Sequence, residues 1–150
     1  MLRIRVEVEV RPTESLDRIK QAIQNLFDYE RTIVKKQGNS LLIVAEAKSP
    51  KALNKLHSLL RKQRILDASR GHIKRGVKGN RIVFYLNKQA AFMGMVSFCS
   101  VPEKESPLGP IRFEIECANE MMVEEFLDWL VPRTINGVPV GELKEPPKDS

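Results

Sequence analysis

Hydrophobic and polar residues alternate without interruption over residues 2–10 of the chain. Every even position from Leu2 to Val10 is aliphatic, and the odd positions between them carry charge. A period of two residues is typical of a strand with one face on the core and the other in water. Four further segments have strand-like patterns: 30–36, 41–47, 81–87 and 111–117. The first two flank a turn cluster and predict a hairpin whose second strand lies inside the sheet.

Other segments carry apolar residues at the three- and four-residue spacing of amphipathic helices. They are 14–28, 49–75, 88–93 and 119–131. Thr13, Ser49 and Asn119 are suitable N-caps for three of these segments. The second helical region continues, with or without a break, until Gly76 and Gly79 are expected to end it.

The predicted order of elements is β-α-β-β-α-(α)-β, followed by a β-β-α extension that starts with the apolar segment 95–99. Strands joined by hairpins and packed under amphipathic helices predict an α+β fold with a largely antiparallel sheet. A length of 150 residues suits one domain. We expect this domain to span 1–134, and 135–150 to form a partly irregular extension because Gly and Pro recur there.

Positive charge changes this picture because it is concentrated in one stretch. Residues 51–88 contain eleven basic residues and a single acid, Asp67, so the stretch has a net charge of +10 against +6 for the whole chain. Basic side chains without neighbouring acids favour a polyanionic partner. We therefore predict a non-enzymatic protein that binds structured RNA by contacting the sugar-phosphate backbone of the RNA. The predicted contact residues are Lys51, Lys55, Arg61, Lys62, Arg70, Lys74, Arg75, Lys78 and Arg81.

The acidic C-terminal third leaves a second interpretation open. Residues 101–150 contain eleven acids and five basic residues. Four of these acids cluster on the last predicted helix: Glu120, Glu124, Glu125 and Asp128. Such a face can neutralise the basic stretch within the fold or across a dimer. The alternative function is therefore a homodimeric interaction protein or assembly subunit whose basic and acidic faces bind protein.

Few residues suggest catalysis or a cofactor. His57 and His72 lie in the basic region without a nucleophile motif, and we interpret them as surface residues. The sequence has no P-loop, dinucleotide fingerprint or metal-ligand spacing, so no cofactor or metal is expected. Residues 76–79 match the GXXG of a KH domain, but a helix end followed by a turn explains them better. No apolar run approaches the ~18–20 residues of a membrane helix, and a cytoplasmic location is expected.

The chain has two cysteines, Cys99 and Cys117. They would lie opposite each other if the apolar segment 95–99 and the strand 111–117 formed a hairpin centred on Leu108. A disulfide between them would be unusual in the cytoplasm of most organisms, and its formation is left open.

Five short segments, taken together and in order, resemble an archaeal family known as uncharacterised protein family 0201. They are Val10–Pro12, Arg64–Arg70, Lys88–Ala91, Lys104–Ile111 and Asp128–Thr134. The resemblance covers nearly the whole chain. It implies an α+β fold similar to the ribosomal protein that binds 5S rRNA, a homodimer, RNA binding and a link to the archaeal exosome. It supplies no catalytic residues.

Overall fold

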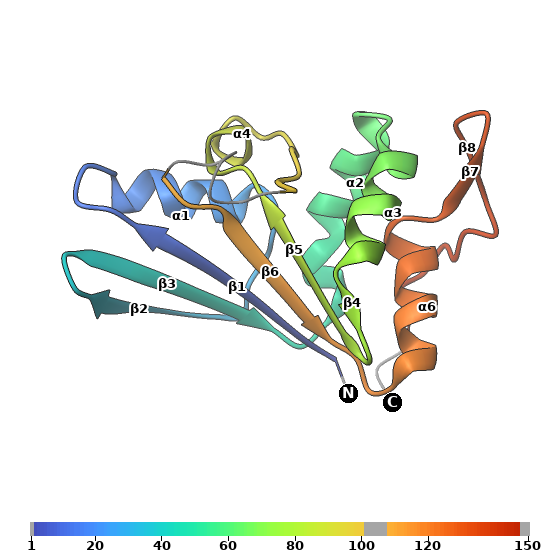
Figure 1. Ribbon diagram of the computed structural model, residues 1–150, viewed down its shortest axis with the longest axis horizontal. Coiled ribbons are helices and arrows are strands. Elements are labelled where there is room, and N and C mark those ends of the chain that lie inside the picture. Colours follow the sequence, from blue (N-terminus) through green and yellow to red (C-terminus); the bar gives the residue numbers. More distant parts are fainter. Residues whose placement is uncertain (1, 101–107, 148–150) are drawn as a thin grey trace.

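The alternating N-terminal segment forms β1 (Arg3–Val10), the third of six strands in one sheet of the computed structural model, which describes residues 2–100 and 108–147. The order across the sheet is β2-β3-β1-β6-β5-β4, and every pair is antiparallel (Figure 1). The other strands are β2 (Arg31–Gln37), β3 (Ser40–Ala47), β4 (Val77–Lys78), β5 (Arg81–Leu86) and β6 (Ile111–Glu116). The predicted hairpin and the interior position of its second strand are confirmed.

The helices form close to the predicted segments. They are α1 (Leu16–Gln24), the 3-10 helix η1 (Pro50–Leu53), α2 (Asn54–Lys62), α3 (Leu66–Arg75), α4 (Lys88–Phe92) and α6 (Glu120–Leu130). Ser15, and not Thr13, caps α1 by accepting a hydrogen bond from the backbone N–H of Arg18. The long helical region is broken between α2 and α3, where Arg64 has a positive φ of 57°.

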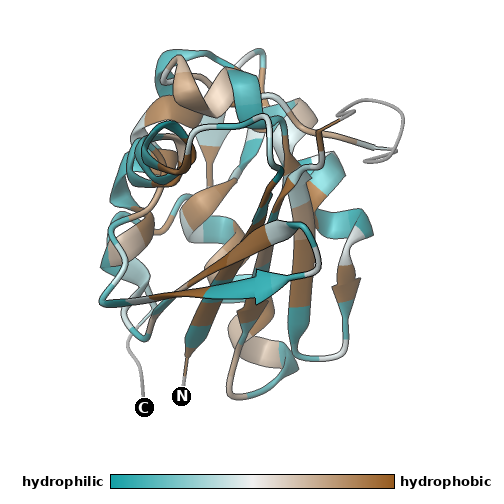
Figure 2. Cartoon of the chain, turned by 90° about the vertical axis from the view of Figure 1, so that its left-hand side faces the viewer, coloured by the Kyte–Doolittle hydropathy of each residue, from teal (hydrophilic) through white to brown (hydrophobic). Residues whose placement is uncertain are grey.

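The helices pack on one face of the sheet because the alternating strands present their aliphatic side chains to that side. Ile4, Val6 and Phe113 from the strands join helical residues in one hydrophobic core. Trp129 of α6 is 2% exposed and belongs to this core. In Figure 2, brown extends along much of the central strands, whereas the helices carry both teal and brown segments. The opposite face of the sheet carries charged pairs, including Arg112 with Glu114.

The chain after α6 forms a second, two-stranded sheet. Strands β7 (Arg133–Ile135) and β8 (Val138–Val140) make a hairpin that spans the predicted domain boundary at residue 134. Beyond the hairpin, the backbone N–H of Leu143 donates to the carbonyl of Asp128 at 3.3 Å. This contact returns the chain to α6, so part of the predicted irregular extension is regular and attached to the domain.

The segments 95–99 and 111–117 do not form the hairpin that would place the two cysteines opposite each other. Strand β6 lies between β1 and β5, and the segment 95–99 contributes only an isolated bridge from Phe98 to Leu86. The backbone N–H of Cys99 donates to the carbonyl of Tyr85, whereas that of Cys117 donates to Asn80 at the other end of β5. Both cysteines are buried and are not joined to each other by a disulfide, and burial raises the pKa of Cys117 to about 11.

None of the helices in the described parts of the chain has the length and apolar character needed to cross a membrane. Within residues 2–100 and 108–147, no group of three or more His, Cys, Asp or Glu side chains is arranged to hold a metal ion.

Candidate nucleic-acid interface

Arg61, one of the predicted contact residues, makes its hydrogen bonds to other residues of the same chain. Its Nη1 donates to the carbonyls of His57 at 2.9 Å and Leu130 at 3.1 Å, and its Nη2 donates to the carbonyl of Trp129 at 3.0 Å. Its Nε donates to the carboxylate of Glu142 at 3.0 Å. Because a guanidinium has five N–H donors and no acceptor, these contacts leave little for a phosphate. Arg61 therefore joins α2 to α6 and to the C-terminal segment.

Arg70 is likewise internal, with a side chain that is 9% exposed. Its Nη1 donates to the carbonyl of Val131 at 2.9 Å and to the carboxylate of Asp128 at 3.1 Å, while Nη2 lies 3.9 Å from Glu124. These contacts hold α3 against the C-terminal half of α6. We therefore leave Arg61 and Arg70 out of the proposed contact residues, because their charges are already paired.

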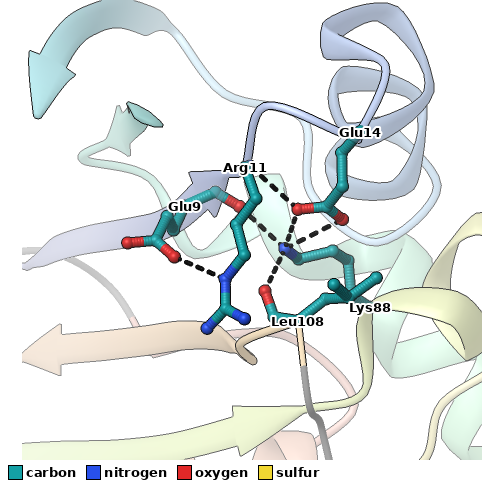
Figure 3. A network of polar contacts seen from close by, with 5 residues as sticks. All are labelled: Glu9, Arg11, Glu14, Lys88 and Leu108. Carbon is teal, nitrogen blue, oxygen red and sulfur yellow. Dashed lines mark hydrogen bonds and ion pairs between the residues drawn. The ribbon is translucent and has the colours of Figure 1, made fainter. Parts of the chain in front are cut away.

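Lys88 also belongs to the basic stretch, but its side chain is only 2% exposed. Its Nζ donates to the carbonyls of Glu9 at 2.7 Å and Leu108 at 2.8 Å, and to both carboxylate oxygens of Glu14 at 3.0 and 3.2 Å (Figure 3). Burial lowers the pKa of Lys88, and the Glu14 carboxylate opposes that shift. This ammonium joins the end of β1, the start of α1 and the approach to β6, so it cannot reach a surface ligand.

The remaining seven predicted contact residues form two exposed groups. The first, which we call the α2 lysine row, consists of Lys51 on η1 and Lys55 and Lys62 on α2. Spacings of four and seven residues place them on the side of the helix opposite the buried Leu56 and Leu60. The row extends over roughly 16 Å at the rise of an α-helix.

Lys55 differs from the other two members of the row because it has partners. Its Nζ lies 2.9 Å from the Asp28 carboxylate and donates to the carbonyl of Gln24 at 2.8 Å. Both side chains of this ion pair are about half exposed. An exposed pair of this kind contributes at most about 1 kcal/mol, so a phosphate can compete for the lysine. Lys51 and Lys62 have no ion pair with any residue that the structure describes.

A groove of about 440 Å³ lies beside the row, and Lys55 and Lys62 are part of its wall. The same exposed face of α2 adds the polar side chains of Asn54 and Ser58. Asn25 and Gly94 close the groove from two other elements. The position of Ser58 on the lysine side of the helix follows from the sequence, but Asn54, Asn25 and Gly94 were missed. The helical spacing of Asn54 and Ser58 could have indicated Asn54, whereas nothing local to Asn25 or Gly94 places them beside α2.

Two side-chain amides fix the walls of this groove. Asn25 donates from Nδ2 to the carbonyl of Ala91 at 2.9 Å, which attaches the end of α1 to α4. Gln63 donates to the carbonyl of Val96 at 3.0 Å and accepts from the Val96 backbone N–H at 2.7 Å. This reciprocal pair attaches the end of α2 to the segment that follows α4. The groove is therefore bounded by elements that are connected to one another before any ligand binds.

The second exposed group lies where α3 leads into the sheet. It comprises Lys74 and Arg75 on α3, Lys78 on β4 and Arg81 on β5. Arg81 is paired with Glu116 at 3.0 Å on the open face of the sheet. The other three have no ion pair among residues 2–100 and 108–147. The GXXG segment occupies this junction between a helix and a strand, so it is not the helix-to-helix loop of a KH domain.

The described acidic side chains of α6 form ion pairs with only one residue of the basic stretch, the buried Arg70. Within α6, Asp128 and Glu124 approach Arg70. No described acid of α6 forms an ion pair with a lysine of either exposed group. Among the described residues, pairing of the basic stretch with α6 is therefore confined to Arg70. In the two exposed groups, only Lys55 and Arg81 are paired with described acids, and these acids lie on other elements.

The interpretation of His57 as a surface residue is wrong. Its ring stacks on Trp129 with the centroids 4.9 Å apart, and the contact orients it towards the core. Burial, followed by the nearby Arg61 cation, lowers the pKa of His57, so its imidazole is neutral at pH 7. His72 is partly exposed and stacks on Phe98 at 5.2 Å.

Comparison with known proteins identifies the family. A family model described as RNA binding matches residues 3–117. A UPF0201 protein of Saccharolobus islandicus is 44% identical over 147 residues, which cover 98% of this chain and 99% of the relative. The chain belongs to the UPF0201 family. A UPF0201 protein of Sulfurisphaera tokodaii is 46% identical over 142 residues, or 95% of each chain.

Solved UPF0201 structures have the same fold. The UPF0201 protein from Methanococcus jannaschii superposes with a TM-score of 0.75 at 32% identity, covering 92% of this chain and 98% of that one. A protein of the DUF54 family from Methanothermobacter thermautotrophicus has a TM-score of 0.61 at 15% identity, covering 76% of this chain and 82% of that one, which shows similarity of fold alone. The resemblance to archaeal family 0201 and the α+β class are thus confirmed. The likeness to the 5S-rRNA-binding ribosomal protein stays a prediction.

Proposed function

We propose that this UPF0201 protein is a non-enzymatic RNA-binding protein that contacts the phosphates of structured RNA through the α2 lysine row. The observation that carries the proposal is the exposure of Lys51, Lys55 and Lys62 along one side of η1 and α2, where Lys55 and Lys62 also line the groove. Lysine ammonium groups suit phosphates because they act as mobile point charges. The match to a family described as RNA binding supports the same ligand.

The groove favours recognition of RNA shape over base sequence. Its described lining is polar or basic apart from Leu59 and Gly94, and no aromatic ring contributes to it. Asn54 and Ser58 can exchange hydrogen bonds with ribose 2′-hydroxyls, which distinguish RNA from DNA. Lysines on either side of these amide and hydroxyl groups can then contact the flanking phosphates. We therefore expect a paired RNA stem to bind more tightly than duplex DNA of the same length.

Reversing the charge of the lysine row should abolish most of this binding. In the Lys51→Glu, Lys55→Glu, Lys62→Glu variant, three phosphate contacts become repulsive. The log–log slope of affinity against salt should become shallower by about one unit for each lysine lost. The measurement is fluorescence anisotropy with a labelled RNA hairpin and the matching DNA duplex over a salt series.

A matched control separates a local contact from the effect of total charge. Lys35→Glu, Lys36→Glu and Lys144→Glu change the net charge by the same amount at exposed positions away from the groove. This control should keep most of the RNA affinity and nearly the same salt slope. Equal losses in the two triple variants would contradict a defined contact surface. Weak, salt-insensitive binding by the unmodified protein would refute the proposed function.

A second candidate role is that of a homodimer or assembly subunit, including an exosome-type complex. It is favoured by the apolar face of the β7–β8 hairpin, where the paired residues Ile135 and Val138 are 64% and 62% exposed. Exposed apolar side chains gathered on one face indicate an interaction site.

If this face holds a dimer together, the molecular mass measured in solution should be that of a dimer at both low and high salt. The double variant Ile135→Ser, Val138→Ser should then be a monomer. A dimer that dissociates with salt would indicate charged faces instead, and a monomer under all conditions would contradict the role.

A further inference from the structure

A small hollow lies at the edge of β5, beyond the short strand β4. Strand β4 pairs with β5 only at Arg81 and Ile82. Further along β5, the backbone N–H of Val83 donates to the carbonyl of Gly76 at 3.0 Å, and the carbonyl of Tyr85 accepts from Cys99 at 2.9 Å. The end of α3 and the segment around Cys99 therefore flank this edge. A hollow of about 230 Å³ remains between them.

Aromatic rings form the side of this hollow. His72 stacks on Phe98 with centroids 5.2 Å apart and planes 9° from parallel. Phe98 in turn contacts the buried Phe84 at 5.9 Å, and Phe84 stacks on Phe113 of the core at 5.0 Å. The rings thus continue from the core to the surface, where His72 is the outermost member and is partly exposed. Because packing fixes its orientation, the imidazole can offer a planar stacking surface with little loss of side-chain entropy on binding.

The charge at the rim indicates what kind of ring this surface would receive. Arg75 lies three residues after His72 on α3 and lines the same hollow. Lys74 and Lys78 are exposed beside it, and none of the three is paired with an acid of the described chain. An apolar peptide would make no favourable charge interaction with these cations. A nucleotide would, because its phosphate can pair with a cation while its planar base stacks on the imidazole. The volume is below the range of about 300–1,000 Å³ that drug-sized ligands occupy, so it suits one ring system and no more.

We propose that this hollow receives one unpaired base of the RNA, stacked at His72, with its phosphate at Arg75. This inference rests on the proposed function, since the α2 lysine row would hold the paired part of the same molecule. Proteins recognise single-stranded RNA by stacking unpaired bases on aromatic and histidine rings. A stacked base contributes about 1–3 kcal/mol, which corresponds to roughly a 5- to 150-fold gain in affinity.

The probe is a pair of RNA hairpins that differ in one feature. One has a fully paired stem, and the other has a single bulged adenosine in an otherwise identical stem. We expect the bulged hairpin to bind at least about fivefold more tightly. In the His72→Gln and Arg75→Ala variants this preference should disappear, while affinity for the fully paired hairpin should stay within about twofold. Thermal unfolding of both variants, followed by circular dichroism, verifies that they fold.

The two histidines of the chain allow a direct readout of the contact. Imidazole signals in a ¹H–¹³C NMR spectrum are assigned with the His72→Gln variant. The ring current of a stacked base should shift the His72 signal upfield when the bulged hairpin is added. His57 is half-buried against Trp129 and does not line the hollow, so its signal should not move.

Each outcome decides the inference. Preference for the bulged hairpin with a shift confined to His72 supports it. Equal affinity for both hairpins and an unmoved His72 signal overturn it, while the proposed function stands. If the NMR signal of His72 shifts by the same amount with both hairpins, His72 contacts the RNA backbone and not an unpaired base. This result also overturns the inference. Failure of both hairpins to bind refutes the proposed function and this inference together.

Discussion

Replacing Lys88 by methionine should lower the free energy of unfolding by about 3–5 kcal/mol, since removal of one partner leaves a buried charge uncompensated. The Glu14 side chain is only 8% exposed, and its carboxylate would lose the ammonium that lies 3.0 Å away. The carbonyls of Glu9 and Leu108 would lose the same donor. Urea denaturation at pH 7 measures the change, and the midpoint should fall while the slope stays constant.

Two controls show whether the buried pair causes this loss. Lys74→Met removes an exposed, unpaired lysine and should change stability by no more than about 0.5 kcal/mol. The double variant Lys88→Met, Glu14→Gln removes both charges and should recover part of the loss, because no buried carboxylate remains unpaired. A decrease below about 1 kcal/mol in the single variant would contradict this account of Lys88.

The lowered pKa of Lys88 adds a pH dependence with a definite sign. Burial shifts the pKa of the folded protein below the ordinary lysine value of 10.5. Between these two values the unfolded chain binds the proton and the folded chain does not, so this group makes stability increase with pH. Below the folded pKa both states are protonated and the contribution is constant. The stability difference between the native protein and Lys88→Met should therefore grow as the pH approaches 10.5 from below.

Replacing Gly76 by alanine should destabilise the protein by about 2–3 kcal/mol, the cost of a severe steric overlap in a packed site. A Cβ atom at this position would lie 1.8 Å from the carbonyl oxygen of Val83 and 2.9 Å from its carbonyl carbon. Both neighbours are backbone atoms, so no side chain can move aside. The end of α3 would have to separate from β5 and lose the hydrogen bond from Val83 N–H to the Gly76 carbonyl.

The chain contains a matched control for this substitution. Gly71 lies five residues earlier in the same helix, and a Cβ atom there would meet nothing within 4 Å. Gly71→Ala should therefore raise stability by up to about 1 kcal/mol, because alanine favours the helix over glycine. Thermal or urea unfolding of the two variants should give changes of opposite sign. A neutral or stabilising Gly76→Ala would show that close approach is not the reason for glycine at this position.

The sequence predicted the elements because their signals are local. The alternation from Leu2 to Val10 requires only that neighbouring side chains point to opposite faces, so the strand can be recognised without knowing which strands pair with it. Asn119 caps α6 as predicted, since its Oδ1 accepts from the backbone N–H of Met122 at 2.9 Å. Charge concentration in 51–88 is equally a property of sequence. The fold class and most element boundaries could therefore be inferred from the chain alone.

Tertiary structure alone decided which charges remain available. Arg61 and Glu142 are 81 residues apart in sequence, Arg70 and Asp128 are 58 apart, and Lys88 and Glu14 are 74 apart. Nothing in the local pattern distinguishes these basic residues from the exposed lysines, because their partners are brought together only when helices pack on the sheet. The position of β6 between β1 and β5 was hidden for the same reason. Side-chain periodicity fixes which residues form an element and which face is apolar, whereas the packing of distant elements determines which polar groups are paired and which can meet a ligand.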